Sequence, residues 1–529
     1  MSDPEDSRGA RLPGDLLRPE AYGAVTSQAA PAPVLRTTHA SWVFLTAHDA
    51  WKVKRPVNFG FLDFRTPAAR RQACEDEVRL NRRLAPEVYL GVEPIHDTPA
   101  GLALAGDGPV VDWAVHMRRL PDQASASARL ARGLLDARAL ESVAVRLAFF
   151  LRDARATPAF GTPEALRRNL DENFDQVAVF VGDLLDRLTF DDVRSFQLGR
   201  LAADQDRFAA RVAAQRIREG HGDLRLEHLY FLPDPGGSAH PVIIDCIEFN
   251  ERFRCADVAA EVAFLAMELE AAARPDLAAG FLARFAEASD DYDLYGVLDF
   301  YLSYRAWVRA KVAAFVATDE SATGEVRARK RDEAQLHFGL ARAVAGRPLV
   351  PPLLLAVGGV IGSGKSTLAA GLGRALAAPV VRSDQTRKHL AGVDLVARAP
   401  AGAYDRAARD RVYEEILRHA RVVAGAGRDV ILDATFSTRR WRQAAADVAR
   451  ACAARFVFVE ARCPADEVRR RLAARRGSPS VSDATDETLD AFLREYEPIG
   501  ERDPGPHLAV DTAGDPEAAI REAMRGIAG

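Results

Sequence analysis

Residues 359–366 read GVIGSGKS and match the phosphate-binding loop pattern GxxxxGK[ST] in full. Glycines let the backbone wrap closely around a phosphate, so that its N–H groups point inward. In such loops the lysine, here Lys365, reaches the β- and γ-phosphates, and the hydroxyl of Ser366 holds Mg²⁺. The motif therefore predicts a site for ATP and Mg²⁺, with nucleotide contacts from Gly359, Gly362, Ser363, Gly364, Lys365, Ser366 and Thr367.

Two aspartates follow apolar runs downstream of this loop. Asp433 ends the run 429–433 and matches the Walker B element, which predicts a carboxylate near Mg²⁺. Asp384 follows the run 379–383, in a segment that resembles P-loop kinases of the polynucleotide-kinase and gluconate-kinase type. That resemblance implies that Asp384 activates an acceptor hydroxyl, and Arg387 is the candidate to hold a substrate phosphate. The alternative for this segment is a helix N-cap beside a solvated arginine.

A cluster of arginines lies on an expected helix after Cys463-Pro464, and a polar loop at 477–483 follows it. The arrangement resembles the lid of a small-molecule kinase. Helical spacing places Arg471 and Arg475 on one face, where they would neutralise charge on the transferred phosphoryl group. The alternative is a solvated basic helix face. Because no aromatic residues interleave with the arginines, nucleic acid is the less favoured acceptor.

A second acidic constellation lies far upstream. Asp223 belongs to the loop HGDLRLEH at 221–228, and Asp245 ends the apolar run 242–244. A loop aspartate followed by a strand-end aspartate is a phosphotransfer pattern, in which the first accepts the hydroxyl proton and the second holds Mg²⁺. A lysine on an earlier strand and a glutamate on the next helix complete that pattern.

Several blocks of this region resemble a known family. They are THASWVFL at 38–45, KVKRPVNFGFLDF at 52–64, LNRRLAP at 80–86, HGDL at 221–224 and DCIEFN at 245–250. They resemble bacterial proteins that fuse an aminoglycoside-phosphotransferase-like, kinase-fold domain to a P-loop kinase-like ATPase domain, over the chain from about 35 to its end.

The resemblance implies Asp223 as catalytic base, Asp245 as metal ligand and a nucleotide-binding strand lysine. Strand alternation cannot separate Lys52 from Lys54, which face the same side, and the frame of residues 51–54 favours Lys54. The helix partner is expected at Glu77, with Glu75 as second choice.

Two departures from the family pattern stand out. His228 occupies the position five residues after the loop aspartate, where asparagine is usual, and imidazole suits Mg²⁺ less well than oxygen does. There is also no G-x-G-x-x-G between the first strands. The alternative for this domain is therefore a non-catalytic module that senses a ligand and regulates an ATPase.

The elements that would hold these residues predict two domains of different class. Strand candidates at 353–360, 379–383, 429–433 and 455–460 alternate with helices, which predicts an α/β P-loop domain with a parallel sheet at 353–529. A protein-kinase-like α+β domain is expected at 35–345, with a linker at 346–352 and a flexible segment at 1–34.

Bulk properties fit an ordinary globular protein. The 529 residues carry a net charge of −4, and the five cysteines lack CxxC spacing, so a reducing cytoplasmic setting is expected and no membrane span. The expected function is ATP-dependent phosphotransfer to a hydroxyl of a small-molecule or nucleotide-like acceptor, with a possible second phosphotransferase site in the N-terminal domain. A polynucleotide 5′-hydroxyl kinase is the other alternative.

Overall fold

The computed structural model describes residues 11–23, 32–58, 62–233, 239–348, 350–395, 397–474 and 486–528. The chain forms two compact units. The first comprises Met1–Ser142, Phe150–Leu166 and Ala209–Glu268, and the second comprises Val143–Phe149, Arg167–Phe208 and Leu269–Gly529. The helices after residue 269 thus share a unit with the C-terminal sheet, although the sequence predicts a domain boundary at 346–352.

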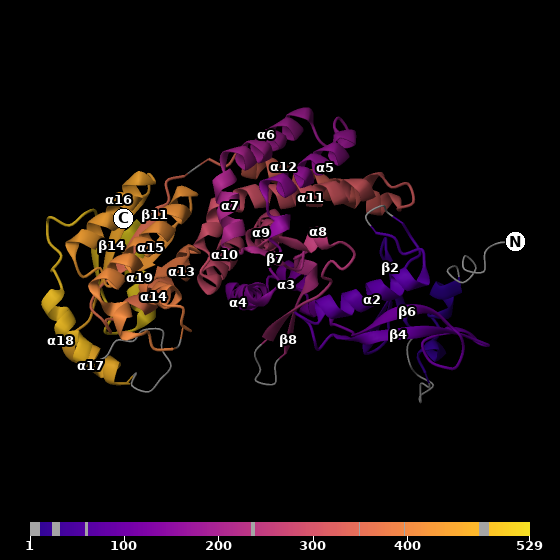
Figure 1. Ribbon diagram of the computed structural model, residues 1–529, viewed down its shortest axis with the longest axis horizontal. Coiled ribbons are helices and arrows are strands. Elements are labelled where there is room, and N and C mark those ends of the chain that lie inside the picture. The colour runs from indigo at the N-terminus through magenta and orange to yellow at the C-terminus, as the bar shows by residue number, and fades with distance from the viewer. Residues whose placement is uncertain are drawn as a thin grey trace. The chain divides into compact units, whose positions relative to one another are not determined.

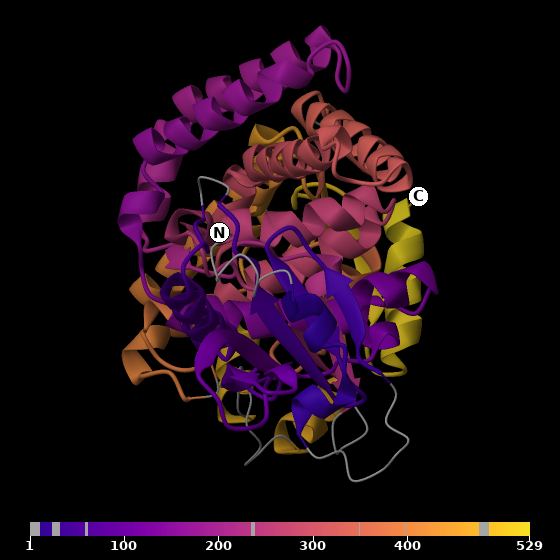
Figure 2. The same ribbon diagram turned by 90° about the vertical axis from the view of Figure 1, so that its right-hand side faces the viewer.

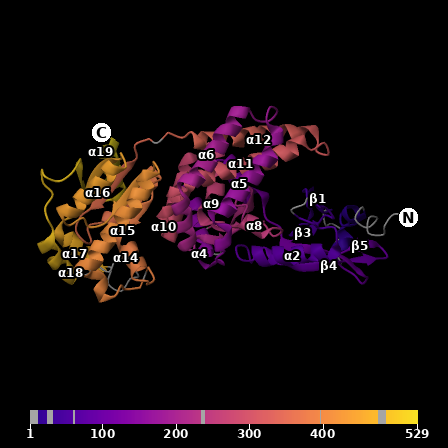
Figure 3. The same ribbon diagram turned by 45° about the horizontal axis from the view of Figure 1, so that its top comes forward.

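The first unit contains a six-stranded antiparallel sheet in the order β1-β2-β3-β6-β4-β5. Its strands are β1 (Val34–Thr37), β2 (Ser41–Leu45), β3 (Asp49–Lys54), β4 (Tyr89–Thr98), β5 (Gly101–Ala103) and β6 (Val110–Arg118). Figure 2 turns these indigo strands toward the viewer. Helix α2 (Pro67–Asn81) packs against one face of the sheet (Figure 3).

Strand alternation sorts the side chains of β3 between the two faces of this sheet. Ala50 joins the apolar cluster that contains Cys74 and Val78 of α2, whereas Val53 belongs to the cluster on the other face. Because side chains two apart share a face, Lys52 and Lys54 both point toward α2.

The other face is covered by residues predicted to be flexible. Leu12, Leu16 and Ala21 are buried and join the cluster of Phe44 and Val53. The prediction of a flexible segment is therefore wrong for residues 11–23, because Leu12, Leu16 and Ala21 pack together against the sheet.

The rest of the first unit supplies the loops that hold the acidic residues. Two short pairs of strands frame them: β7 (Ile217–Glu219) with β10 (Cys255–Asp257), and β8 (Leu229–Pro233) with β9 (Ala239–Ile243). The single turn η5 (Leu226–His228) leads directly into β8.

Helices make up most of the chain between the two sheets. Their bounds are α3 (Ala126–Ala131), α4 (Ala137–Asp153), α5 (Pro163–Val177), α6 (Arg187–Ala203), α7 (Gln205–Ala213), α8 (Glu251–Arg254), α9 (Val258–Ala271), α10 (Pro275–Ser289), α11 (Leu298–Thr318) and α12 (Gly324–Ala345), with short 3₁₀ turns η1 (Pro19–Tyr22), η2 (Asp122–Ala124), η3 (Pro158–Phe160), η4 (Ala178–Phe180) and η6 (Tyr292–Gly296). No helix among the described residues is both long and apolar enough to cross a membrane.

The second unit contains a five-stranded, fully parallel sheet in the order β12-β13-β11-β14-β15. The strands are β11 (Leu353–Gly358), β12 (Val380–Arg382), β13 (Val430–Asp433), β14 (Arg455–Arg462) and β15 (His507–Asp511). Val357 and Arg382 both lie level with Asp433 in the register. The carboxyl ends of three neighbouring strands therefore meet at one edge, which is where ligands bind in open α/β sheets.

Helices cover both faces of this sheet (Figure 1). Contacts place α13 (Lys365–Leu376) with α19 (Pro516–Ala528), and α15 (Arg406–Gly425) with α16 (Arg439–Ala451). The remaining helices are α14 (Ser383–Leu390), α17 (Ala465–Ala474) and α18 (Asp486–Glu495), with the turn η7 (Ala401–Tyr404). The predicted fold classes of both regions are confirmed.

The edge strand β12 is bonded to residues outside the P-loop region. The Val380 N–H donates to Glu287 Oε1 at 2.9 Å, and the Tyr292 hydroxyl donates to the Val380 carbonyl at 2.8 Å. Both partners belong to the helical part of the same unit, at α10 and η6. The outward-facing amide and carbonyl of this edge residue are thereby satisfied.

Candidate phosphate-binding sites

The GxxxxGKS loop connects β11 to α13, as the sequence predicts, and its backbone requires glycine. Gly359 has φ +136°, and a Cβ there would lie 2.6 Å from the Ala461 carbonyl oxygen. Gly364 has φ +89° immediately before α13 begins. The Ser363 hydroxyl is fully buried and has no hydrogen-bond partner within the described part of the chain. The loop thus forms a turn that leads directly into a helix N-terminus, where an anion is favoured.

Asp433 lies buried at the end of β13, with 4% of its surface exposed. Its Oδ1 has no hydrogen-bond partner among the described residues, while the carboxyl hydrogen bonds with the side chain of Ser366. Burial raises the pKa of Asp433, and the charges of Lys365 and Arg382 oppose that rise. A hydroxyl and a carboxylate with a free oxygen are hard oxygen ligands of the kind Mg²⁺ takes, so Ser366 and Asp433 fit the predicted ion.

Asp384 lies in the first turn of α14, at the carboxyl end of β12. Its carboxylate forms an ion pair with Arg387, whose guanidinium also lies 4.9 Å from the centre of the Tyr404 ring. The N-cap of α14 is Arg382, so Asp384 does not cap this helix. The structure therefore pairs the predicted base with the predicted phosphate-holding arginine, and a third of the Asp384 side chain stays exposed.

Arg471 lies on α17 and is tied to the chain at three points. Its guanidinium donates to Glu467 Oε1 at 2.7 Å, to the Thr512 carbonyl at 2.7 Å and to the Ala513 carbonyl at 3.1 Å. It lines a cavity of about 390 Å³ together with Gly364, Thr367, Leu368, Ala474, Thr512, Pro516 and Ala519. Arg475 and the lid loop 477–483 lie outside the described residues, so the expected pairing of Arg471 with Arg475 stays a prediction.

Sequence reasoning missed the turn after β15. Thr512 donates its hydroxyl to the Arg462 carbonyl at 2.8 Å and also contacts the Ser363 carbonyl of the phosphate-binding loop. The signal was present in the run HLAVDTAGDP at 507–516, an alternating strand followed by a small polar turn and a proline at the start of a helix.

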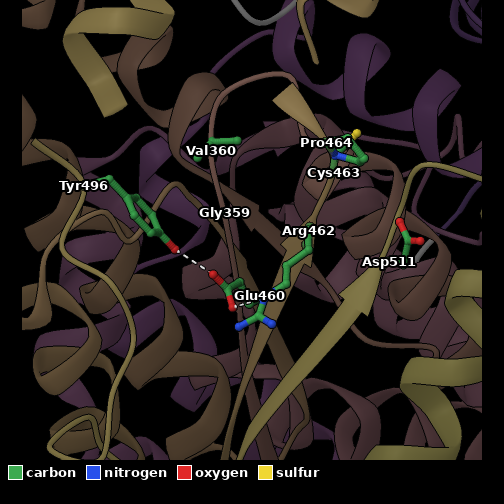
Figure 4. A pocket seen from close by; sticks show the side chains of 9 residues that line it. Gly359, Val360, Glu460, Arg462, Cys463, Pro464, Tyr496 and Asp511 are labelled. Atoms are coloured by element: carbon green, nitrogen blue, oxygen red, sulfur yellow. Dashed lines mark hydrogen bonds and ion pairs between the residues drawn. The ribbon is translucent and has the colours of Figure 1, made fainter. Parts of the chain in front are cut away.

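A second cavity, of about 500 Å³, lies at the start of the loop and is lined by Gly359, Val360, Glu460, Ala461, Arg462, Cys463, Pro464, Tyr496 and Asp511 (Figure 4). Tyr496 points toward Glu460 and donates its hydroxyl to Glu460 Oε1 at 3.1 Å. Arg462 donates to Glu460 Oε2 at 2.8 Å. This hollow was also missed, because Glu460 reads in the sequence only as the last residue of a strand.

In the first unit, Lys52 lies between two of the predicted site residues. Its ammonium is 2.8 Å from Glu77 Oε1 and 2.7 Å from Asp245 Oδ1. Asp245 has φ +66°, a left-handed conformation that is uncommon for a residue with a side chain. Partial burial favours the neutral form of Asp245, but Lys52 and His228 hold the pKa of its carboxyl well below its ordinary value.

Lys54 occupies a different position on the same face of β3. Its ammonium contacts Glu77 Oε2 at 2.5 Å and also Glu248, and only 2% of its side chain is exposed. Glu77 is fully buried and forms ion pairs with both lysines, whereas Glu75 is partly exposed and forms an ion pair with Arg71 at 2.9 Å. The structure thus brings Glu77, and not the second choice Glu75, to the lysines.

His228 links the two aspartates of this unit. Its Nδ1 lies 2.8 Å from the Asp223 carbonyl oxygen, and its Nε2 lies 3.5 Å from Asp245 Oδ2. The Asp223 carboxylate lies 3.5 Å from Arg225. The neighbouring His221 is buried, and burial together with the charge of His228 lowers its pKa to about 4. Asp223, His228, Asp245, Lys52 and Glu77 therefore form one contiguous site, with Lys54 behind it.

No glycine-rich loop covers this site at the turn between β1 and β2. Residues 38–41 form a tight turn, in which the Thr38 N–H donates to the Ser41 carbonyl at 2.9 Å. Arg55 donates to the carbonyls of Thr38 and His39, each at 3.0 Å, and holds the turn closed. The structure therefore has a tight turn without glycine at residues 38–41, where the resemblance implies a glycine-rich loop.

Comparison with known proteins finds one matching family and several similar solved structures. A family described as an AAA domain matches residues 354–499, which contain the phosphate-binding loop, Asp384 and Asp433. Among solved structures, a gluconokinase from Sinorhizobium meliloti 1021 has a TM-score of 0.26 and 23% identity, covering 34% of this chain and 92% of that one. A putative aminoglycoside phosphotransferase from Ralstonia eutropha JMP134 has a TM-score of 0.34 and 12% identity, covering 64% of this chain and 97% of that one.

Relatives at full length come from mycobacteria. Rv2004c of Mycobacterium tuberculosis and Mb2027c of Mycobacterium bovis are each 34% identical over 512 residues, which is 92% of this chain and 94% of each relative. The chain therefore belongs to the family that these mycobacterial proteins represent.

Proposed function

We propose that residues 353–528 transfer the γ-phosphoryl group of ATP to a hydroxyl of a small-molecule or nucleotide-like acceptor. The observation that carries this proposal is the meeting of the GxxxxGKS loop, Asp433 and Asp384 at the carboxyl edge of one parallel sheet. A nucleotide switch or a motor protein would need only the GxxxxGKS loop and Asp433. Asp384, beside Arg387 on α14, adds a base that can act on an acceptor hydroxyl.

The chain's own groups supply the steps of this reaction. The loop N–H groups and Lys365 hold the phosphates, and the cavity beside Thr367, Arg471 and Pro516 receives the base of the nucleotide. Asp384 accepts the proton of the acceptor hydroxyl, and Arg387 orients that carboxylate. When bound by Ser366 and Asp433, Mg²⁺ would neutralise negative charge on the phosphates.

The test separates nucleotide binding from transfer. Asp384→Asn is expected to keep ATP binding and to lower the transfer rate by about 10²–10⁴-fold, which is the usual contribution of a general base. Asp394→Asn, at an exposed aspartate soon after α14, is the matched control. The acceptor is sought by mass spectrometry of a metabolite extract incubated with ATP and the protein. Transfer at the wild-type rate by Asp384→Asn would contradict the proposal.

The same purified protein decides whether the acceptor is a polynucleotide end. If oligonucleotides with a 5′-hydroxyl are phosphorylated, and Asp384→Asn abolishes that labelling, the polynucleotide alternative replaces the small-molecule acceptor. Absence of labelling excludes it.

We also propose that the first unit holds a second nucleotide-phosphate site, in which Lys52, and not Lys54, contacts the phosphates. The position of Lys52 supports this proposal, because its ammonium contacts Asp245 and 14% of its side chain is exposed, compared with 2% for Lys54. His228 and the tight turn at 38–41 favour ligand binding over rapid phosphotransfer. ATP binding that survives in a Lys365→Ala variant and is lost on adding Lys52→Met would support this site. No residual ATP binding in Lys365→Ala would refute it.

A further inference from the structure

His228 stands at the position where an oxygen ligand is expected, and its surroundings determine which of its nitrogens is available. A carbonyl oxygen only accepts hydrogen bonds, so the 2.8 Å contact with the Asp223 carbonyl requires the proton on Nδ1. The neutral ring then carries its lone pair on Nε2. This is the arrangement of metal-binding histidines, in which the second nitrogen donates to a carbonyl or carboxylate and fixes the ring.

The free nitrogen faces carboxylate oxygens. His228 Nε2 lies 3.5 Å from Asp245 Oδ2 and 3.8 Å from Glu227 Oε1. The other oxygen of Asp245 is bonded to Lys52, so Oδ2 is the one turned toward the imidazole. Two ligands held about 2.1 Å from one ion lie roughly 3–4 Å apart, and the separation of Nε2 from Oδ2 falls in that range.

The chemistry of this pair differs from that of the P-loop site. Ser366 and Asp433 offer oxygen alone, which suits Mg²⁺. Imidazole nitrogen suits first-row transition ions, whose affinity for a nitrogen-containing site exceeds that of Mg²⁺. His228 is only 8% exposed, so its ring is held in place before any ion arrives.

We propose that His228 Nε2 and Asp245 Oδ2 form a site for a first-row transition dication in the first unit, with Mn²⁺ preferred over Mg²⁺. The chain then carries two cation sites of different selectivity, an all-oxygen site at the P-loop and a nitrogen–oxygen site at His228. This inference does not depend on whether either unit transfers a phosphoryl group.

Electron spin-echo envelope modulation of the full-length protein with Mn²⁺ alone tests this site directly, because it detects a nitrogen bound to the ion. The wild-type protein is expected to give ¹⁴N modulation typical of imidazole. His228→Asn and His228→Ala are expected to lose it. His240→Asn is the matched control, since its Nε2 also faces a carboxylate, Glu87 Oε1 at 3.1 Å, outside this site. Asp433→Asn should keep the signal while removing manganese from the P-loop.

Competition gives the second readout. Displacement of the nitrogen-bound Mn²⁺ should need at least about tenfold more Mg²⁺ than unlabelled competing Mn²⁺. A difference of this size is typical for the loss of a contact that supports a metal ligand. His228→Asn should make the affinities of this site for Mg²⁺ and Mn²⁺ more nearly equal. If wild-type protein with bound Mn²⁺ shows no ¹⁴N modulation, or if the modulation persists in His228→Asn, the proposal is wrong and His228 is an ionic partner of Asp245. Omission of nucleotide makes either result independent of the ATP-turnover tests.

Discussion

Replacement of each strand lysine by methionine should separate a structural role from a binding role. Lys54→Met removes a cation with a side chain 2% exposed from between Glu77 and Glu248, which are 0% and 7% exposed. Breaking a buried ion pair by deleting one partner costs about 3–5 kcal/mol, because the remaining charge stays desolvated. Lys52→Met leaves Glu77 paired with Lys54, and it frees Asp245, whose side chain is 44% exposed and is therefore hydrated.

Hydrogen exchange measured by mass spectrometry on peptides from β3 and β6 gives the opening free energy of the sheet in the full-length protein. Lys54→Met should accelerate exchange there by roughly two to four orders of magnitude, since about 1.4 kcal/mol is a factor of ten. Lys52→Met should change exchange far less and abolish nucleotide binding to the first unit. Adding Glu248→Leu to Lys54→Met removes the stranded carboxylate and should recover part of the loss.

The result that refutes this reasoning is the opposite pattern. If Lys54→Met leaves exchange unchanged and removes nucleotide binding, then Lys54 is the phosphate-contacting lysine favoured by the sequence frame. A loss of protection in the peptides of the parallel sheet would show instead that the substitution acts globally.

Three further substitutions test groups with unusual surroundings. Asp433→Asn should raise the free energy of unfolding by about 1–3 kcal/mol in metal-free buffer. The raised pKa of Asp433 means that its ionised form destabilises the wild-type fold as pH rises above 3.8. Denaturant melts of Asp433→Asn should therefore lack that pH dependence, and its ATP turnover should fall. For His221, the folded pKa of about 4 lies below the unfolded value of 6.5, so the stability that it contributes above pH 6.5 is lost as the pH falls toward 4. When the free energy of unfolding is measured against pH, His221→Gln should not show this loss. Arg471→Ala releases the Thr512 and Ala513 carbonyls and should raise the KM for ATP by about tenfold, a loss of roughly 1.4 kcal/mol, with kcat less affected.

The sequence predicted the P-loop region well because its signals are local. The strand, the glycine-rich loop and the helix are contiguous, so a single window contains the site from Gly359 to Thr367. Asp384 and Asp433 could be placed beside the loop because parallel strands present their carboxyl ends at one edge.

Residues whose role depends on distant contacts were harder to predict. Alternation placed Lys52 and Lys54 on one face but could not show which of them reaches Asp245, since that contact spans nearly the whole first unit. The cavity at Glu460 and Tyr496 joins residues from separate elements, and no short window contains both. Leu12 and Leu16 were assigned to a flexible segment because composition, and not the partner sheet, guided that prediction.

The bonding of β12 has a consequence for how this chain can be divided. An edge strand with unpaired N–H and C=O groups is a template on which another molecule can add a strand. Glu287 and Tyr292 hydrogen bond to the N–H and the carbonyl of Val380, so these two groups cannot pair with an added strand. A protein cut in the linker at 346–352 would lose both partners of Val380, and these backbone groups would be unpaired at the β12 edge of the sheet. The helices before the linker are therefore part of the same folded unit as the sheet, and a boundary at 346–352 would divide that unit.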